Sequence, residues 1–254
     1  LMGGPDAERD ISIQSGQAVA NALREHGQFV VGEHIIDIPT AEELDYITCD
    51  IIFPVLHGPF GGGGALQILL ENSGKKFVGS RSVAAEQAMD KVKTKEIAIG
   101  RGITTPPWCT VTENSNCTIK PPVVIKPLND GSSLDIEICH SQAVIDTAIR
   151  NLLQSRESVL VEKYVCGREL TVGIINGQPL PIIEIIPPSD LGTYDFEAKY
   201  NREDTQFIPQ PKLPDNSCVD SAISIYKAMG IQDIARVDFI LEGTESWLLE
   251  INTM

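Results

Sequence analysis

The feature that most constrains the fold is an alternation of predicted strands and helices through the first 79 residues. Apolar residues recur at helical spacing before Gly27, and β-rich runs then alternate with a second helical segment. Such alternation favours a parallel α/β domain, which binds ligands at the carboxyl ends of its strands. Gly3-Gly4 and His57-Gly58 fall at such ends. The predicted elements are a helix over 12–26, strands over 29–38 and 50–56, a helix over 65–72 and a short strand over 77–79.

The rest of the chain predicts two α+β units after this α/β domain. A lysine-bearing helix over 89–101 ends at Gly102 and at the Pro106-Pro107 pair, which a helix does not cross. The expected division is 1–79, 80–165 and 166–254, with a long polar loop over 187–215. The other predicted elements are strands over 123–127, 134–139, 159–165, 170–175, 181–186, 235–241 and 246–252 and helices over 142–153 and 219–229.

The charge of the chain restricts its partners. A formal net charge of −15 in 254 residues argues against nucleic acid as the main partner, because phosphate backbones require a basic surface. ATP remains compatible, since a few lysines and a divalent cation can converge locally. No apolar stretch approaches the roughly 20 residues that span a membrane. The six cysteines lack a CxxC pair and are predicted to be free thiols in a reducing cytosol: Cys49, Cys109, Cys117, Cys139, Cys166 and Cys218.

The last two predicted strands form a hairpin that carries a candidate metal site. Alternation places Arg236 and Asp238 on one face of the first strand, and Leu248, Glu250 and Asn252 on one face of the second. A loop with an odd number of residues would place Asp238 opposite Glu250. Facing carboxylates repel each other unless a cation lies between them, and an all-oxygen donor set suits Mg²⁺, with Mn²⁺ as a second candidate. A solvated polar hairpin face is the alternative.

A candidate phosphate site lies in the middle of the chain. The strand over 123–127 delivers Lys126 next to a small-residue loop that contains Gly131, Ser132 and Ser133. Backbone N–H groups and hydroxyls of such a loop can surround phosphate oxygens while the lysine supplies a positive charge. The loop is not a Walker A motif, because GxxxxGK[ST] occurs nowhere. A hairpin turn beside a surface lysine is the alternative.

Two further segments fit a nucleotide site. The apolar strand over 159–165 ends in Glu162 and Lys163, which is typical of an adenine slot, and Glu169 follows as a candidate ribose ligand. Many edge strands end in charge, so this signal is weak alone. The long loop carries Lys199 and Tyr200, and we interpret it as a lid that covers the γ-phosphate and excludes water. A solvated loop is the alternative.

Taken together and in order, these motifs closely resemble the D-alanine–D-alanine ligases, which are ATP-grasp enzymes of peptidoglycan synthesis. The resemblance implies an N-terminal parallel α/β (pre-ATP-grasp) domain followed by an ATP-grasp fold of two subdomains. It covers the chain from end to end. The residues that carry it are Gly3 to Arg9, Leu56 to Gly58, Met89 to Lys91, Lys126-Pro127 with Gly131 to Ser133, Glu162-Lys163, Tyr194 to Tyr200, Arg236 to Asp238 and Glu250 to Asn252.

The resemblance also implies a role for each site residue. A D-alanine carboxylate attacks the γ-phosphate, and the amine of a second D-alanine displaces phosphate from the acyl phosphate. Tyr200 favours the dipeptide over an ester product. A cytoplasmic homodimer that contacts through its N-terminal domain is expected. Glu8 would hold the D-alanine ammonium and hydrogen-bond the Ser132 region, which with Tyr200 ties the N-terminal domain to the lid. The other implied roles are Lys91, Lys126 and Lys199 on the phosphates, Glu162, Lys163 and Val165 at the adenine, Glu169 at the ribose, His57 at the D-alanine carboxylate, and Arg236 at the oxyanion.

Three departures from the family pattern keep alternatives open. Gly61 to Gly64 replace a stretch that usually contains acidic residues, which predicts reduced rigidity over 59–64. Asp135 replaces a glycine and either approaches the phosphates or points away. The chain is expected to lack its first residues and a second-substrate segment beyond Met254. An ATP-grasp nucleotide-binding protein without ligase activity and a ligase for D-lactate or D-serine are therefore the competing hypotheses, whereas a structural interaction protein explains none of the motifs.

Overall fold

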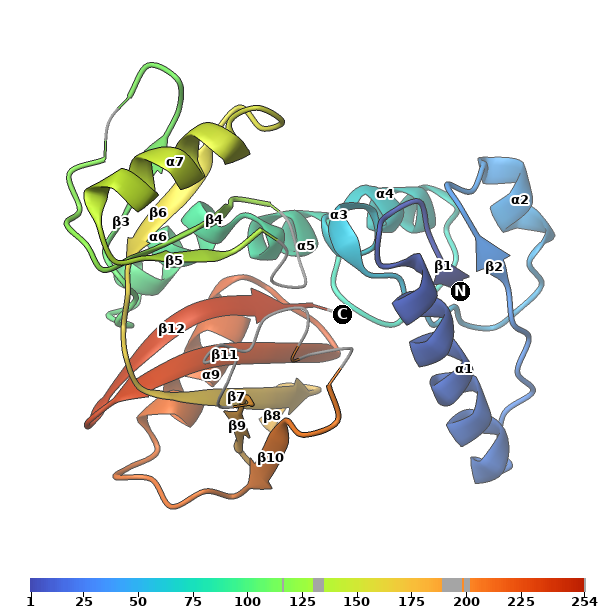
Figure 1. Cartoon of the computed structure of the whole chain (residues 1–254). Helices are drawn as coiled ribbons and strands as arrows, with labels where there is room; N and C mark the ends of the chain where they lie inside the picture. Colours follow the sequence, from blue (N-terminus) through green and yellow to red (C-terminus); the bar gives the residue numbers. More distant parts are fainter. Residues whose placement is uncertain (116, 130–134, 189–197, 199–201, 254) are drawn as a thin grey trace.

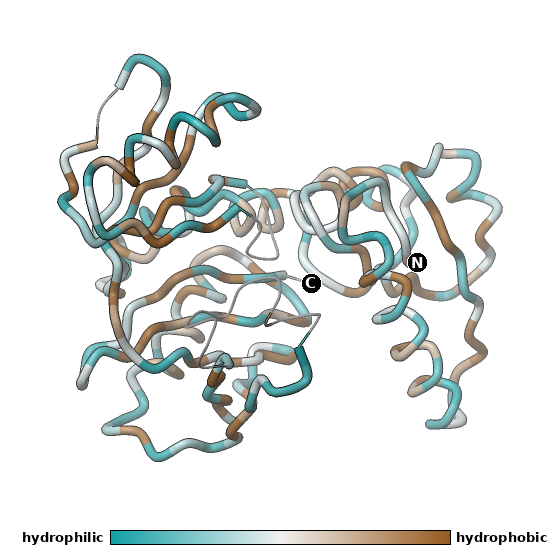
Figure 2. The backbone as a smooth tube through the Cα atoms, in the orientation of Figure 1, coloured by the Kyte–Doolittle hydropathy of each residue, from teal (hydrophilic) through white to brown (hydrophobic). Residues whose placement is uncertain are grey.

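The computed structural model describes residues 1–254 except 116, 130–134, 189–197, 199–201 and 254. Figure 1 shows three units: an N-terminal unit on one side, and two sheet-containing units that lie one above the other on the opposite side. In Figure 2, hydrophobic segments run through the strands of the two larger sheets. None of the helices in the described part of the chain combines the length and the apolar character needed to cross a lipid bilayer.

The N-terminal unit is a small parallel α/β arrangement. Strand β1 (Met2–Gly3) pairs in parallel with β2 (Ile35–Ile36), and Ile52 forms a parallel bridge with Phe77. The predicted helices are present as α1 (Arg9–His26) and α4 (Ala65–Asn72). The helices α2 (Ala41–Tyr46), α3 (Gly58–Gly62) and α5 (Ser82–Met89) were not predicted. The core of this unit consists of Leu44, Ile47, Ile52, Leu56, Leu66, Leu70 and Phe77.

The strand predicted over 29–38 is mostly wrong, because only Ile35–Ile36 pair with another strand. A β-rich run forms a ladder only where a partner strand supplies hydrogen bonds and cover. The partner here, β1, ends at Gly3-Gly4, where both residues have positive φ values of 99° and 97°. Val30 is accordingly fully exposed.

The central unit is an antiparallel sheet in the order β3-β6-β4-β5, and α7 (Gln142–Leu152) covers one face (Figure 1). The predicted strands are present as β4 (Val123–Pro127), β5 (Glu137–Cys139) and β6 (Val159–Lys163). The edge strand β3 (Trp108–Val111) was not predicted. Its buried core comprises Val111, Val123, Ile125, Cys139, Ile145, Ala148, Val159 and Val161.

The C-terminal unit is an antiparallel sheet in the order β10-β9-β7-β11-β12, with β8 (Gln178–Pro179) paired to β7. Helices α5 and α6 (Lys91–Gly100) contribute Ala84, Ala88 and Ala98 to its core, although they precede the central sheet in sequence. The β10 strand lies within the predicted polar loop. The other elements are β7 (Arg168–Ile175), β9 (Ile183–Ile186), β10 (Gln206–Pro209), α9 (Ser217–Ala228), β11 (Ile234–Glu242) and β12 (Glu245–Asn252).

The prediction of six free thiols is wrong. Cys109 on β3 and Cys117 in the following loop form a disulfide, with their Cα atoms 6.0 Å apart. The turn between them brings the chain back beside β3, a proximity that a search for CxxC spacing does not detect. The cysteines that are free are Cys49, Cys139, Cys166 and Cys218.

Candidate active site

The terminal hairpin places Asp238 directly opposite Glu250, as expected, but by a different route. The loop is Gly243-Thr244, which has an even number of residues and by itself would place Asp238 opposite Leu249. The register shifts by one residue between Asp238 and Phe239, so that Leu249 is the extra residue of a β-bulge. The bulge therefore creates the pair of facing carboxylates.

The same bulge corrects the predicted faces of β12. Leu248 was expected to share a face with Glu250 and Asn252. Instead Leu248 and Ile251, three residues apart, are both buried in the hydrophobic core. Because the extra residue interrupts the two-residue alternation, the strand buries Leu248 while it presents Glu250 toward Asp238.

Asp238 is a buried carboxylate with several hydrogen-bond donors. Thr171 Oγ1 donates to Oδ1 at 2.7 Å, and Asn252 Nδ2 donates to Oδ2 at 3.1 Å. The Arg236 guanidinium adds hydrogen bonds at 2.9 and 3.0 Å, while its own side chain stays 49% exposed. Thr171 and Asn252 thus hold the carboxylate of Asp238 from within the protein, while the half-exposed guanidinium of Arg236 contacts it as well.

The donors of this hairpin suit a hard divalent cation. Two facing carboxylates and one amide are oxygen ligands, which is the set that Mg²⁺ prefers, and substrate phosphates usually complete its shell. Among the described residues, no group of three or more His, Cys, Asp or Glu side chains could hold a metal. The residues present therefore fit an ion that shares its coordination with a substrate better than a closed structural metal site.

Helix α6 carries two buried lysines one turn apart. Asp90 caps the helix by accepting hydrogen bonds from the N–H groups of Val92 and Lys93 at 2.9 and 3.1 Å. Lys91 and Lys95 then fall on one face, as i and i+4 positions do. Lys91 Nζ lies 4.0 Å from Glu250 Oε2 on β12.

Lys95 extends from α6 into a charged cluster on the central sheet, which consists of Lys95, Glu162 and Lys126. Lys126 Nζ lies 2.5 Å from Glu162 Oε1, and Lys95 Nζ lies 2.8 Å from Glu162 Oε2. These three side chains are exposed by only 0% (Lys95), 3% (Glu162) and 6% (Lys126). The predicted phosphate lysine is therefore present, and a predicted adenine residue holds it in place.

The electrostatics of this cluster follow from its burial. Burial alone would raise the pKa of Glu162, but Lys126 and Lys95 outweigh it, so that the pKa lies below its ordinary value. Burial lowers the pKa of Lys95, an effect that Glu162 opposes and Lys126 reinforces. Our sequence reasoning assigned no role to Lys95. Its position four residues after Lys91 was the available signal.

The structure brings the predicted D-alanine residues near the hairpin. Glu8 is buried at the start of α1, and His57 precedes α3, where its Nε2 lies 3.5 Å from Ser15 Oγ. Burial lowers the pKa of His57, Glu8 opposes this, and Arg236 reinforces it. Because both Glu8 and Arg236 influence the pKa of His57, residues of the N-terminal unit and of β11 lie within electrostatic range of each other.

The remaining adenine and ribose candidates lie along β6 and β7. Lys163 is exposed, with its Nζ 5.4 Å from the centre of the Trp247 ring, and Val165 is buried. Glu169 lies on β7, paired with Ile240 and Ile185. Ser132, Lys199 and Tyr200 lie outside the described residues, as does most of the predicted lid.

The structure also locates two of the departures. Asp135 is exposed and forms an ion pair with Arg156 at 2.6 Å, so its carboxylate has a partner of its own. Gly61 lies in α3 against the Leu56 carbonyl, where an added Cβ would approach to 2.4 Å. A larger residue would clash there, and the reduced rigidity of 59–64 stays a prediction.

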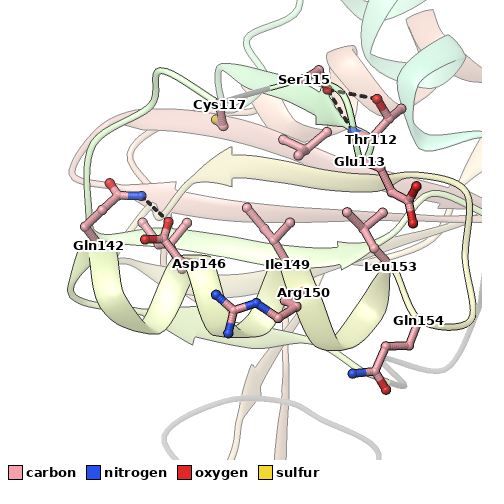
Figure 3. Close-up of a pocket in the computed structure, with 12 residues that line it drawn as sticks. Thr112, Glu113, Ser115, Cys117, Gln142, Asp146, Ile149, Arg150, Leu153 and Gln154 are labelled. Carbon is pink, nitrogen blue, oxygen red and sulfur yellow. Dashed lines mark hydrogen bonds between the residues drawn. The ribbon is translucent and has the colours of Figure 1, made fainter.

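A pocket of about 730 Å³ lies elsewhere, between α7 and the loop after β3 (Figure 3). Ile145, Ile149 and Leu153 are among its apolar lining residues, and Gln142 Nε2 donates to Asp146 Oδ1 at 2.8 Å at one end. None of the predicted site residues lines it. The candidate site is therefore not this pocket.

Comparisons with known proteins agree with the motif order. Residues 100–254 match the sequence family described as D-ala D-ala ligase C-terminus. The chain is 38% identical to the D-alanine–D-alanine ligase of Methylacidiphilum infernorum and 35% identical to that of Syntrophotalea carbinolica, covering 100% of this chain and 84% of each relative.

Solved structures show the same fold. The crystal structure of D-alanine–D-alanine ligase from Bacillus anthracis complexed with ATP superimposes with a TM-score of 0.81 at 26% identity, covering 99% of this chain and 84% of that one. The VanG D-Ala:D-Ser ligase of Enterococcus faecalis superimposes with a TM-score of 0.79 at 23% identity, covering 99% of this chain and 88% of that one. The latter likeness concerns the fold alone.

Proposed function

The chain belongs to the D-alanine–D-alanine ligase family, and from this premise we propose that it joins two D-alanine molecules at the expense of ATP, for peptidoglycan synthesis (EC 6.3.2.4). The observation that carries the proposal is the pair of facing carboxylates, Asp238 and Glu250, close to the buried Lys91 and beside Arg236. This arrangement combines a site for a cation with positive groups for transferred phosphate, as phosphoryl transfer requires.

Asp238, Glu250 and Asn252 would hold Mg²⁺, or Mn²⁺ in its place. The bound ion would neutralise charge on the phosphate oxygens. Arg236 now donates hydrogen bonds to Asp238. Because the Arg236 side chain is half exposed, it can turn toward the substrate when another cation takes over Asp238. Arg236 is then available to stabilise the oxyanion that forms when the second amine attacks the acyl phosphate.

The nucleotide lies, in our proposal, between the central and C-terminal sheets. Lys91 and Lys126 bind its phosphates. Both side chains are already buried and oriented by ion pairs, which lowers the entropy cost of ordering them when ATP binds. The adenine lies against β6, where Glu162, Lys163 and Val165 surround it, and Glu169 binds the ribose. Ser132 and Lys199 are proposed to complete the phosphate site from the resemblance alone.

The first D-alanine lies between the N-terminal unit and β11. Glu8 accepts hydrogen bonds from its ammonium, and His57 lies near its carboxylate. The lowered pKa of His57 keeps the ring neutral near neutral pH, so that it does not neutralise the attacking carboxylate. In the first step this carboxylate attacks the γ-phosphate and ADP leaves. In the second, the amine of the other D-alanine attacks the carbonyl and phosphate leaves. Tyr200 is proposed to close this site together with Ser132.

The direct test is ADP release by the protein with Mg²⁺, ATP and D-alanine, repeated with D-lactate and with D-serine as second substrate. We expect ADP release that depends on D-alanine, and formation of the dipeptide when neither D-lactate nor D-serine is present. ATP binding without D-alanine-dependent release would identify a nucleotide-binding protein instead. Faster product formation with D-serine or D-lactate would change the assigned acceptor.

We also propose that the protein acts in the cytoplasm, where ATP is formed, and pairs through its N-terminal unit. Several large apolar side chains of that unit are more than half exposed, with Val30 and Tyr46 at 105% and 86%. Such residues commonly mark protein interfaces. Sedimentation analysis of the protein and of a Tyr46→Glu variant tests this: we expect a dimer that the variant converts to a monomer, and a monomeric wild type would contradict it.

A further inference from the structure

Lys95 is a fully buried charge that the proposed reaction does not use. Its side chain has 0% exposure, yet its ammonium has three oxygen partners: Glu162 Oε2 at 2.8 Å, Thr105 Oγ1 at 2.8 Å and the Pro106 carbonyl at 3.2 Å. The Trp108 ring lies below it, with the ring centre 5.4 Å from Nζ. A lysine is buried so completely only when its charge is matched, and here the Glu162 carboxylate supplies the opposite charge.

Two of these partners lead to opposite sides of the proposed nucleotide site. Through Glu162, Lys95 contacts the carboxylate that holds Lys126 at 2.5 Å. Through Thr105, whose hydroxyl donates to the Leu248 carbonyl at 2.9 Å, it reaches the C-terminal hairpin. Leu248 immediately precedes the bulged residue that turns Glu250 toward Asp238.

The hydrogen bonds converge at the point where β12 changes register. Thr104 receives the N–H of Leu248 on its carbonyl at 2.9 Å, so the segment before Pro106 contacts Leu248 through both its N–H and its C=O. One turn earlier on α6, Lys91 lies 4.0 Å from Glu250 itself. Helix α6 therefore faces the central sheet with one lysine and the C-terminal hairpin with the other, as its place between the two sheets in Figure 1 indicates.

We propose that Lys95 is a positioning residue that fixes the phosphate lysine and the metal hairpin relative to each other, acting through Glu162 on Lys126 and through Thr105 on the bulge before Glu250. The kinetic effects expected from this role rest on the proposed ligase function. Lys95 touches neither ATP nor D-alanine in this role. Its contribution is the distance between the two halves of the phosphate site, to which the rate of phosphoryl transfer is sensitive.

A purely stabilising ion pair is the competing explanation, and the two differ in what a substitution changes. Lys95→Met retains the length and most of the apolar volume of the side chain but removes the charge, leaving Glu162 paired with Lys126 alone. If Lys95 positions the site, the variant binds ATP and Mg²⁺ more weakly in its folded form, while the KM for D-alanine changes little. If Lys95 only stabilises the fold, the melting temperature of Lys95→Met falls while the kinetics of the folded variant stay as in the wild type.

The experiment compares Lys95→Met with Lys93→Met, a matched control on the same helix whose lysine is exposed and paired with Glu86 at 3.3 Å. We expect the KM for ATP and the Mg²⁺ activation constant of Lys95→Met to rise about tenfold or more, as removal of one partner of a buried pair implies. The KM for D-alanine should change by less than about twofold, and Lys93→Met should match the wild type. Unchanged ATP and Mg²⁺ constants in folded Lys95→Met would overturn the proposal.

Thr105→Val tests the contact between Lys95 and the bulge separately, because it removes only the hydroxyl between Lys95 and the Leu248 carbonyl. This variant also decides whether Lys95 has a positioning role if Lys95→Met does not fold. It should raise the Mg²⁺ activation constant several-fold, and an unchanged constant would overturn the link to the bulge. Calorimetric titration of each variant with Mg²⁺ and a non-hydrolysable ATP analogue measures the same weakening without turnover. A wild type that binds the analogue but releases no ADP with D-alanine would contradict the proposed function while this titration still tests Lys95.

Discussion

The Lys95–Glu162–Lys126 cluster and the Arg236–Asp238–Asn252 cluster are built from similar groups, yet differ in their access to water. The first is closed, with side-chain exposures between 0% and 6%. In the second, the Asp238 side chain is 11% exposed, but Arg236 above it is 49% exposed. A closed cluster keeps its partners, because separating them leaves a buried charge unpaired. We propose that the open cluster exchanges Arg236 for a cation from solution, since that side chain is half exposed.

This difference divides the two tasks of a phosphate-transfer site. The closed cluster fixes where a lysine points, whereas the open cluster leaves a pair of facing carboxylates available to an ion and a substrate. Substitutions in the first should therefore affect stability and activity together. Substitutions in the second should affect activity far more than stability, and that contrast is measurable.

Glu162→Gln should have the largest combined effect. It leaves Lys95 and Lys126 facing each other without the carboxylate that both contact, and unpaired buried charge costs about 3–5 kcal/mol of the free energy of unfolding. Urea unfolding measures this loss, and ATP binding should weaken as Lys126 is displaced. Glu157→Gln, an exposed position shortly before the same strand, is the control. A loss no larger than that of the control would mean that the cluster is not closed.

Asp238→Asn should give the opposite balance. Activity should fall by about 100-fold or more, since the variant lacks one of the two facing carboxylates that we propose hold the metal for phosphoryl transfer. The free energy of unfolding should change by less than about 1 kcal/mol, because the Arg236 partner is half exposed and the facing Glu250 no longer repels a charge. Steady-state kinetics and urea unfolding of one preparation test both halves. A large loss of stability with little loss of activity would reverse the comparison.

The two regions should also respond to acid in different pH windows. The pKa of Glu162 is lowered by folding, so its stabilising contribution is complete above its ordinary value of 4.5 and is lost as the pH falls through its folded pKa. His57, beside the open cluster, also has a lowered pKa, and its contribution is lost as the pH falls from 6.5 through its folded pKa.

Urea unfolding from about pH 7.5 to well below pH 4.5 should therefore show two phases of lost stability. His57→Gln should remove the phase that begins below about pH 6.5, and Glu162→Gln should remove the one that begins below about pH 4.5. Loss of the upper phase in Glu162→Gln, with His57→Gln unchanged, would show that the assignment is reversed.

Strands could be predicted correctly where a partner strand and a core are present, and not where the partner is missing. Strands β4, β7, β11 and β12 could be predicted because each is a run of strand-favouring residues that a neighbouring strand pairs with and the core covers. The run over 29–38 has similar composition, but β1 is too short to pair with it. Composition records the preference of a strand and not the presence of its partner.

The candidate site shows the same limit at single residues. Asp238 opposite Glu250 was expected from a loop length that is wrong, and the bulge at Leu249 produces the same pairing. Lys95 was missed because its contacts join separate elements, and the Cys109–Cys117 disulfide was missed because the turn between the two cysteines brings them together. Which of the predicted roles are correct is for the variants above to decide.

Thr171→Val should have the smallest effect on activity, and it tests how firmly the neighbouring strand β7 holds Asp238. The Thr171 hydroxyl donates to Asp238 Oδ1 at 2.7 Å from the neighbouring strand β7, and valine keeps its shape without the donor. The loss of one buried hydrogen bond should cost about 1 kcal/mol of the free energy of unfolding, because Asp238 retains Arg236 and Asn252.

Activity should fall only a few-fold in Thr171→Val, with the change concentrated in the Mg²⁺ activation constant, since a carboxylate that lost one of its donors binds the cation in a less fixed orientation. Thr147→Val on the outer face of α7, whose hydroxyl donates to the Ala143 carbonyl at 2.9 Å, is a matched control. If Thr171→Val reduced activity as much as Asp238→Asn, the carboxylate would depend on protein donors for its position, and the second cluster would be closed like the first.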